Sequence, residues 1–244
     1  MSRSGITLGV LATTSFLVLS CQMISNALSA LLGTATSIPP VAWGKGTIED
    51  AAWSPDDRSL AVAGALGLFI YDATSLDLRA FTLSDSALQA VAFSPNGDTL
   101  VTTHTDGSVR LWDAMTGDLL SRLGAHGDEA VTVAFSPDAR TIASGGWDDT
   151  VRLWNAETGE ALATLKGHEG TIKQVVFSAD GESLFSAGED AAVLEWDVAT
   201  RQEVKRLDDF PFGVVSLSMS PDGSLIAIGE GRGRVELRDL AGGS

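Results

Sequence analysis

Short apolar runs separated by polar turns recur along most of this chain. Between residues 126 and 167 lie AVTVAF (130–135), TIASGG (141–146) and TVRLWN (150–155), with ALATL (161–165) after them. Runs of this length that are rich in β-branched residues, or that alternate apolar and polar positions, indicate strands. The intervening SPDA, WDD and AETGE are turn sequences. The pattern predicts four antiparallel strands, the last of them on the outside.

The same pattern recurs at a nearly constant interval. A Ser-Pro pair or a relative of it begins the first turn at residues 54, 94, 136, 178 and 220, and these positions are 40, 42, 42 and 42 residues apart. Four strands in each unit of about 40 residues are typical of a β-propeller blade. We therefore expect an all-β propeller with five four-stranded antiparallel blades. The repeats lie at about 45–83, 84–125, 126–167, 168–209 and 210–244.

Glycines end the first turn in three of the units. Gly97, Gly181 and Gly223 occupy the same place after the Ser-Pro pair or its relative. A positive φ angle is least costly for glycine, so we expect positive φ at these three positions.

The units resemble those of the WD-repeat β-propeller family, in which a repeat ends in Trp-Asp and often opens with Gly-His. Trp112-Asp113, Trp154-Asn155 and Trp196-Asp197 carry the ending, and Ala125-His126 and Gly167-His168 carry the opening. The resemblance covers residues 45–244. It implies a propeller whose loop rim binds other proteins and that is not itself an enzyme.

The resemblance also implies a buried hydrogen-bonded tetrad of His, Ser or Thr, Asp and Trp within a blade. The residues that match are His126, Ser144, Asp148 and Trp154 in the third unit, and His168, Ser186, Asp190 and Trp196 in the fourth. The second unit keeps Thr102, Asp106 and Trp112 but has Ser84 in place of the His. Ser, His and Asp side chains can also form a nucleophilic catalyst, but a catalytic site is single and this set recurs every 42 residues. We interpret the tetrads as structural.

Two units depart further from the pattern. The fifth has Ile228, Arg232 and Arg238 where Ser, Asp and Trp are expected, and the first has a shortened hairpin without an Asp. We expect complete tetrads only in the third and fourth units and looser blades at both ends. His104 aligns with the glycines of the third and fourth units, and we expect it to be a solvated turn histidine outside any tetrad.

The sequence leaves the closure of the ring open. The fifth unit ends without a fourth strand, and SIPPV (37–41) falls where an N-terminal strand could complete that blade. Two prolines are tolerated there because the fourth strand is an outer edge. A closed five-blade ring, an open arc and an incomplete seven-blade ring are all compatible with the sequence.

The first 44 residues differ from the rest. Arg3 precedes an apolar run that ends in VLSC, and no charged residue lies between Arg3 and Lys45. This resembles a bacterial lipoprotein signal, in which Cys21 becomes the acylated first residue. An uncleaved membrane-spanning helix is the alternative, and both place the propeller outside the cytoplasm. We assign residues 1–20 to a signal or anchor, 21–44 to an apolar tether and 45–244 to the propeller; a cytoplasmic location is disfavoured.

Charge excludes several classes of partner. The formal net charge is −16, and no basic stripe is present, so binding to nucleic acid phosphates is disfavoured. Direct binding to anionic lipid is disfavoured for the same reason, which leaves the N-terminus as the means of membrane attachment. No run has the spacing of a calcium loop, and the three histidines are too dispersed for a zinc site. We predict no metal and no cofactor.

We expect a non-catalytic scaffold for protein–protein interactions. By the resemblance, the candidate partner-binding positions on the loop rim are Gln89, Thr105, Val131, Trp147, Lys173 and Glu189. Trp147 is the most informative because an exposed aromatic is typical of a binding hot spot, although it could instead pack on the neighbouring blade. The alternative is a propeller enzyme or envelope assembly factor that uses the central opening. That function needs acids or histidines on the innermost strands, which the second to fifth units almost lack.

Overall fold

Nineteen short strands follow one another along residues 46–240, the part of the chain that the computed structural model describes. They pair in chain order into four four-stranded sheets and one three-stranded sheet, all antiparallel. We call these sheets blades 1 to 5. The predicted fold class, an all-β propeller of antiparallel blades, is confirmed.

The strands have the following bounds. Blade 1 has β1 (Ile48–Trp53), β2 (Ser59–Gly64), β3 (Gly67–Asp72) and β4 (Leu78–Leu83). Blade 2 has β5 (Leu88–Phe93), β6 (Thr99–His104), β7 (Ser108–Asp113) and β8 (Leu119–Ala125). Blade 3 has β9 (Ala130–Phe135), β10 (Thr141–Gly146), β11 (Thr150–Asn155) and β12 (Ala161–Lys166). Blade 4 has β13 (Ile172–Phe177), β14 (Ser183–Gly188), β15 (Val193–Asp197) and β16 (Gln202–Leu207). Blade 5 has β17 (Val214–Met219), β18 (Leu225–Glu230), the 3₁₀ turn η1 (Gly231–Gly233) and β19 (Val235–Asp239).

The first turn of each blade is held by its serine. In blade 3, Ser136 Oγ donates to Asp138 Oδ1 at 2.6 Å and accepts the N–H of Thr141 at 2.9 Å. The glycines that end this turn have φ angles of +79°, +75° and +71° at Gly97, Gly181 and Gly223, as predicted. The turn therefore recurs because both its side-chain hydrogen bonds and its backbone conformation are encoded in the repeat.

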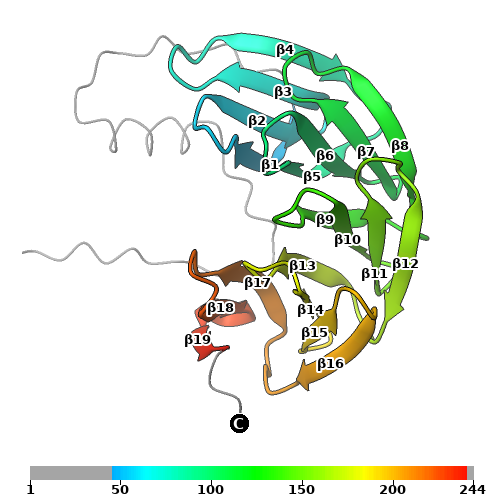
Figure 1. Ribbon diagram of the computed structural model, residues 1–244, viewed down its shortest axis with the longest axis vertical. Helices are drawn as coiled ribbons and strands as arrows, with labels where there is room; N and C mark the ends of the chain where they lie inside the picture. Colours follow the sequence, from blue (N-terminus) through cyan, green and yellow to red (C-terminus); the bar gives the residue numbers. More distant parts are fainter. Residues whose placement is uncertain (1–45, 241–244) are drawn as a thin grey trace, which may run out of the picture.

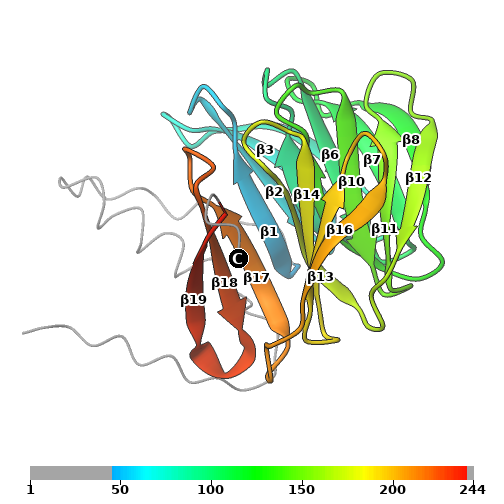
Figure 2. The same cartoon turned by 60° about the horizontal axis from the view of Figure 1, so that its bottom comes forward.

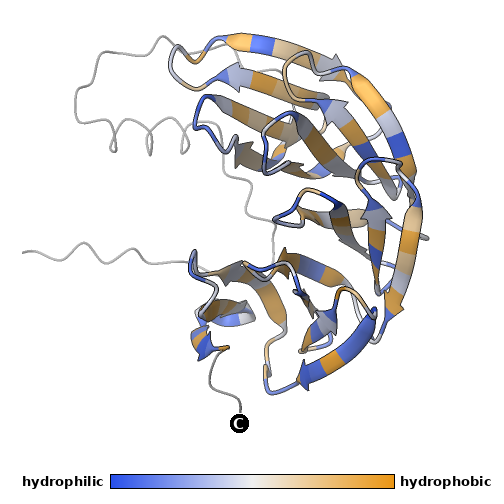
Figure 3. Cartoon of the chain, in the orientation of Figure 1, coloured by the Kyte–Doolittle hydropathy of each residue, from blue (hydrophilic) through white to orange (hydrophobic). Residues whose placement is uncertain are grey.

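The core lies between neighbouring blades. Ala61 and Ala63 of blade 1, for example, pack with Leu100 and Trp112 of blade 2 in one buried cluster. Apolar residues follow the inner strands, and polar residues follow the turns (Figure 3). Each sheet is two-sided, so neighbouring blades stabilise each other.

The blades stand around a common axis as an open arc (Figure 1). Innermost strands pack in succession, β1 on β5, β5 on β9, β9 on β13 and β13 on β17. Within residues 46–240, β17 and β1 do not pack on each other in the same way. The described residues thus do not close into a ring by themselves, and both an open arc and an incomplete seven-blade ring agree with this arrangement. The predicted signal, the tether and the SIPPV segment lie outside these residues.

Blade 5 has three strands within the described chain, and β19 is at its outer edge (Figure 2).

Candidate functional site

Two rims of loops bound the arc. Because strands alternate in direction, the loops between blades and the hairpin turns between second and third strands lie on one rim. The Ser-Pro turns and the turns between third and fourth strands lie on the other. The His residues of both predicted tetrads precede first strands, and their Asp residues lie in the hairpin turns, so we call the first of these rims the tetrad rim.

The four residues of the blade 3 tetrad lie in one hydrogen-bonded chain. Trp154 Nε1 donates to Ser144 Oγ at 2.9 Å, and Ser144 Oγ lies 2.8 Å from His126 Nε2. His126 Nδ1 lies 2.9 Å from Asp148 Oδ1, and the other oxygen of Asp148 accepts the N–H of Gly127 at 2.8 Å. The chain thus links the third strand, the second strand, the loop from blade 2 and the hairpin turn.

Blade 4 repeats this geometry. Trp196 Nε1 and His168 Nε2 both lie 2.8 Å from Ser186 Oγ, and His168 Nδ1 lies 2.9 Å from Asp190 Oδ1. Asp190 also accepts the N–H of Glu169 at 3.0 Å. The two predicted sets of four residues are therefore brought together in the same arrangement.

The electrostatics of the blade 3 tetrad favour a neutral imidazole beside an ionised Asp148, and those of the blade 4 tetrad favour a neutral His168. Burial lowers the pKa of both His126 and His168, although the neighbouring Asp raises it in part. Burial works to raise the pKa of Asp148, but the Gly127 N–H and the His126 imidazole outweigh it and lower that pKa to about 2. Ser144 is fully buried, and its oxygen already accepts the Trp154 N–H, so no substrate reaches this hydroxyl.

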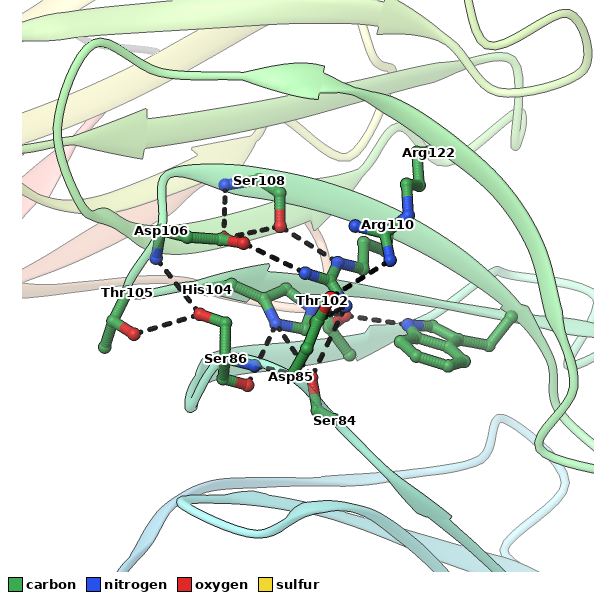
Figure 4. A network of polar contacts seen from close by, with 11 residues as sticks. Ser84, Asp85, Ser86, Thr102, His104, Thr105, Asp106, Ser108, Arg110 and Arg122 are labelled. Atoms are coloured by element: carbon green, nitrogen blue, oxygen red, sulfur yellow. Dashed lines mark hydrogen bonds and ion pairs between the residues drawn. The ribbon is translucent and has the colours of Figure 1, made fainter.

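Blade 2 holds a variant tetrad, and our expectation for His104 was wrong. His104 is fully buried, and its Nε2 lies 2.8 Å from Thr102 Oγ1, which accepts the N–H of Trp112 at 2.7 Å (Figure 4). His104 thus makes the contact that His126 makes in blade 3, although it belongs to the second strand and not to the loop from the preceding blade.

Glycine explains why the histidine could change place. His104 aligns with Gly146, where a Cβ atom would lie 2.9 Å from His126 Nδ1. A side chain at the position of Gly146 would therefore clash with a histidine at the position of His126, in the loop from the preceding blade, and the two cannot occur together. Blade 2 has Ser84 at the incoming position, so the imidazole fits on the strand. The partial tetrad expected in blade 2 is therefore supplemented by a histidine from the strand itself.

A buried arginine completes the blade 2 network. The guanidinium of Arg110 donates to Asp85 at 2.6 Å and to Asp106 at 3.0 Å, and its side chain is 2% exposed (Figure 4). Arg110 lowers the pKa of Asp85 to about 2. Burial, together with Arg110, lowers the pKa of His104 to about 4. All three tetrad aspartates contact an arginine, Asp106 at 3.0 Å and Asp148 and Asp190 at 3.4 Å, but only Asp148 and Asp190 also contact the tetrad histidine.

Blade 5 replaces the tetrad with apolar and cation–π contacts. Phe210 is fully buried where the incoming His is expected, and Ile228 is fully buried where Ser is expected. Arg238, in place of the Trp, lies with its guanidinium carbon 5.1 Å from the centre of the Phe210 ring and donates to Asp209 at 2.8 Å. Arg232, in place of Asp, has a φ of +68°.

The six candidate partner-binding residues all lie on the tetrad rim, with different degrees of exposure. Trp147 is 42% exposed and Glu189 is exposed, whereas Gln89, Thr105, Val131 and Lys173 are half-buried. Lys173 pairs with Glu189 at 2.8 Å. Gln89 contacts Glu129 at 3.4 Å, and Thr105 contacts Ser86 at 3.0 Å.

Sequence reasoning missed two links between blades. Asp50 Oδ2, in blade 1, accepts the N–H of Val91 in blade 2 at 2.9 Å. Thr132 Oγ1, in blade 3, accepts the N–H of Val175 in blade 4 at 3.3 Å. Both residues occupy the third position of a first strand, where β5 has Ala90, and a polar residue at this position is the signal that could have identified them.

The described residues hold neither a metal cluster nor a spanning helix. Within residues 46–240, no three His, Cys, Asp or Glu side chains gather in a way that could hold a metal ion. No helix in that range is long and apolar enough to cross a membrane.

Comparison with known proteins identifies the family. Residues 87–244 match the family model described as the IFT122 first beta-propeller, a range that includes blades 2 to 5. No curated protein matched the chain. The matched range is more than half of the sequence and agrees with the WD-repeat-like blades of the structure. The chain therefore belongs to the IFT122 first beta-propeller family.

Proposed function

We propose that this protein is a non-catalytic scaffold that binds a protein partner on the tetrad rim, with Trp147 near the centre of the contact. The observation that carries the proposal is the exposure of this tryptophan. The tetrad tryptophans Trp112, Trp154 and Trp196 are 2–3% exposed, whereas Trp147 is 42% exposed. Exposed aromatic residues on a rigid support are typical of binding hot spots. Trp147 directly precedes Asp148, so the tetrad of blade 3 supports the turn that carries it.

Charge on this rim favours a partner segment that carries Lys or Arg. Asp149 lies two residues after Trp147, and Asp128 precedes Glu129, whose carbonyl accepts the Trp147 N–H at 2.8 Å. The exposed Glu169 and Glu189 belong to the equivalent loops of blade 4. Lys173 is paired with Glu189. Guanidinium groups can pair with such carboxylates and stack on an indole ring. With a net charge of −16, the protein is unsuited to nucleic acid as a partner.

Affinity purification from native membrane extract tests the proposal. Full-length wild type is compared with Trp147→Ala and with Met115→Ala, a matched control. Met115 is 80% exposed and lies on the opposite rim, in the turn between β7 and β8. We expect Trp147→Ala to lose a partner that wild type and Met115→Ala retain, at equal melting temperature. Equal recovery by all three proteins would show that the contact is elsewhere.

We further propose that the propeller is tethered to a membrane outside the cytoplasm through Cys21, the only cysteine in the chain. The support is the sequence of residues 1–21, which lie outside the described range. Labelling with a radioactive fatty acid is expected to mark wild type and not Cys21→Ser. An unlabelled wild type that stays in the membrane fraction at full length would instead indicate a spanning helix.

A further inference from the structure

The two faces of blade 1 carry different side chains. The face toward blade 2 presents small and aliphatic residues such as Ala61 and Ala63. The opposite face, which we call the outward face, presents Trp53, Leu60, Val62, Phe69, Tyr71, Phe81 and Leu83, which the strand register places side by side. The Phe69 and Phe81 rings are stacked with their centres 4.5 Å apart. The outward face is thus the aromatic side of the sheet.

In the other blades, the corresponding face is an interface. Leu100 and Trp112 of blade 2, which correspond to Leu60 and Tyr71, pack against blade 1. On the outward face of blade 1, the buried cluster contains residues of that blade alone. Trp53, Phe81 and Leu83 are 49%, 45% and 71% exposed. Apolar surface that is contiguous in this way is typical of a site that another segment covers.

The described chain begins on this face. Gly46 and Thr47 line a hollow together with Ile48, Val62, Leu66, Phe69 and Tyr71. The residues that precede Gly46 therefore connect to the chain at the outward face itself. No charged residue occurs between Arg3 and Lys45.

One part of the preceding sequence spaces its apolar residues as an amphipathic helix would. Ile24, Ala27, Leu28, Leu31 and Leu32 follow the spacing i, i+3, i+4, i+7, i+8, and Gln22, Ser25, Asn26 and Ser29 fall between them. This pattern is typical of a helix that covers a protein core, whereas a membrane-spanning helix is apolar on all sides. The 13 residues 33–45 can extend over roughly 40 Å, which is enough to reach any part of one blade.

We propose that residues 22–32 dock their apolar side on the outward face of blade 1, over Trp53, Phe81 and Leu83. The occupant is thus a segment of the same chain, and an acyl group on Cys21 would be held next to blade 1. This inference does not depend on the partner site at Trp147, which is in another blade.

Site-specific photocrosslinking of the full chain tests this docking. The photoreactive residue p-benzoylphenylalanine replaces Phe81 in one protein and, as a control, Val204 in another. Val204 is 62% exposed on β16 of blade 4. Both proteins are irradiated in lipid nanodiscs, after their melting temperatures have been compared with wild type. Crosslinked peptides are identified by mass spectrometry, and a mixture of isotopically light and heavy chains separates contacts within a chain from contacts between copies.

We expect the residue at position 81 to crosslink to the peptide that contains residues 22–32 of its own chain, and the residue at position 204 not to do so. Leu28→Asp combined with Leu31→Asp is expected to abolish the crosslink without unfolding the blades. Crosslinks from position 81 to lipid, to a second copy or to blade 5 would overturn the proposal, as would the absence of any crosslink to residues 22–32.

Discussion

The first and second strands of blade 3 pair in the same register as those of blade 5. The side chains that connect these strands to the loops differ between the two blades. In blade 3, Ser144 Oγ binds Trp154 and His126, and Asp148 fixes the N–H of Gly127 in the preceding loop. In blade 5, Ile228 and Phe210 fill the corresponding positions by packing alone. The backbone of a blade therefore does not require the tetrad.

The difference between the two blades lies in how firmly the loops of the tetrad rim are held. In blade 3, the Asp148 carboxylate connects the loop before the first strand to the hairpin turn, and Asp148 is the residue after Trp147. The corresponding Arg232 in blade 5 lies with its guanidinium carbon 4.8 Å from the centre of the exposed Phe212 ring. Two loops of blade 3 are thus held by charge-assisted hydrogen bonds, which are stronger than neutral ones, and this suits a surface that must keep its shape for a partner.

Removal of the tetrad histidine is expected to have the largest effect. His126→Ala removes one hydrogen-bond partner from each of Ser144 and Asp148 and opens a cavity, so we expect a loss of about 3 kcal/mol in the free energy of unfolding, measured with urea. Arg238→Ala in blade 5 removes a partly exposed ion pair and should cost less than about 1 kcal/mol. Equal losses for the two variants would show that the tetrad has no special contribution.

Blade 2 permits a conversion between the two types of tetrad. His104→Gly alone is expected to cost about 2 kcal/mol because Thr102 loses one of its two buried partners and a cavity opens. Combining it with Ser84→His should restore the arrangement of blade 3 and recover at least about 1 kcal/mol of this loss. Urea denaturation of the four proteins of the cycle measures the coupling. Additive effects would mean that the two positions do not share one imidazole site.

The histidines predict how stability depends on pH. Burial lowers the pKa of His104 to about 4, below the usual value of about 6.5, so the unfolded chain binds this proton more readily. Its contribution to stability is complete above about pH 6.5 and is lost as the pH falls toward 4, by up to about 1.4 kcal/mol per pH unit. His104→Gln should flatten the profile between these limits in urea titrations at several pH values. An unchanged profile would contradict a buried neutral His104.

Asp50 is expected to give the smallest effect. Burial raises the pKa of this carboxyl, although the N–H groups of Val91 and Ala51 lower it in part, so its ionised form is disfavoured in the fold. Asp50→Asn keeps an oxygen acceptor for Val91 and should change stability by less than about 0.5 kcal/mol at pH 7. Asp50→Ala should cost about 1 kcal/mol. Calorimetric melting of both variants tests the link, and a large loss for Asp50→Asn would mean that the charge itself is required.

The sequence predicts the strands of this protein well because each unit repeats the same local signals. The bounds of β9, β10 and β11 coincide with the predicted runs, and the three turn glycines have positive φ. The sequence alignment placed His104 opposite Gly146, which belongs to no tetrad, and so predicted no tetrad role for it. The structure shows that the His104 imidazole reaches Thr102 from the second strand, whereas His126 reaches Ser144 from the loop before the first strand. The sequence analysis also did not identify the aromatic outward face of blade 1. The periodicity of a strand indicates which residues share a face of the sheet, but it does not indicate which element packs against that face.

The central claim is that the tetrads stabilise the blades, whereas Trp147 binds the partner. The dissociation constant of the purified partner tests the contribution of Trp147 most directly. Titrations use wild type, Trp147→Ala and Met115→Ala at a temperature where all three are folded. We expect Trp147→Ala to weaken binding by about 2 kcal/mol, or roughly 30-fold, and Met115→Ala to leave it unchanged. A dissociation constant for Trp147→Ala equal to that of wild type would contradict the account.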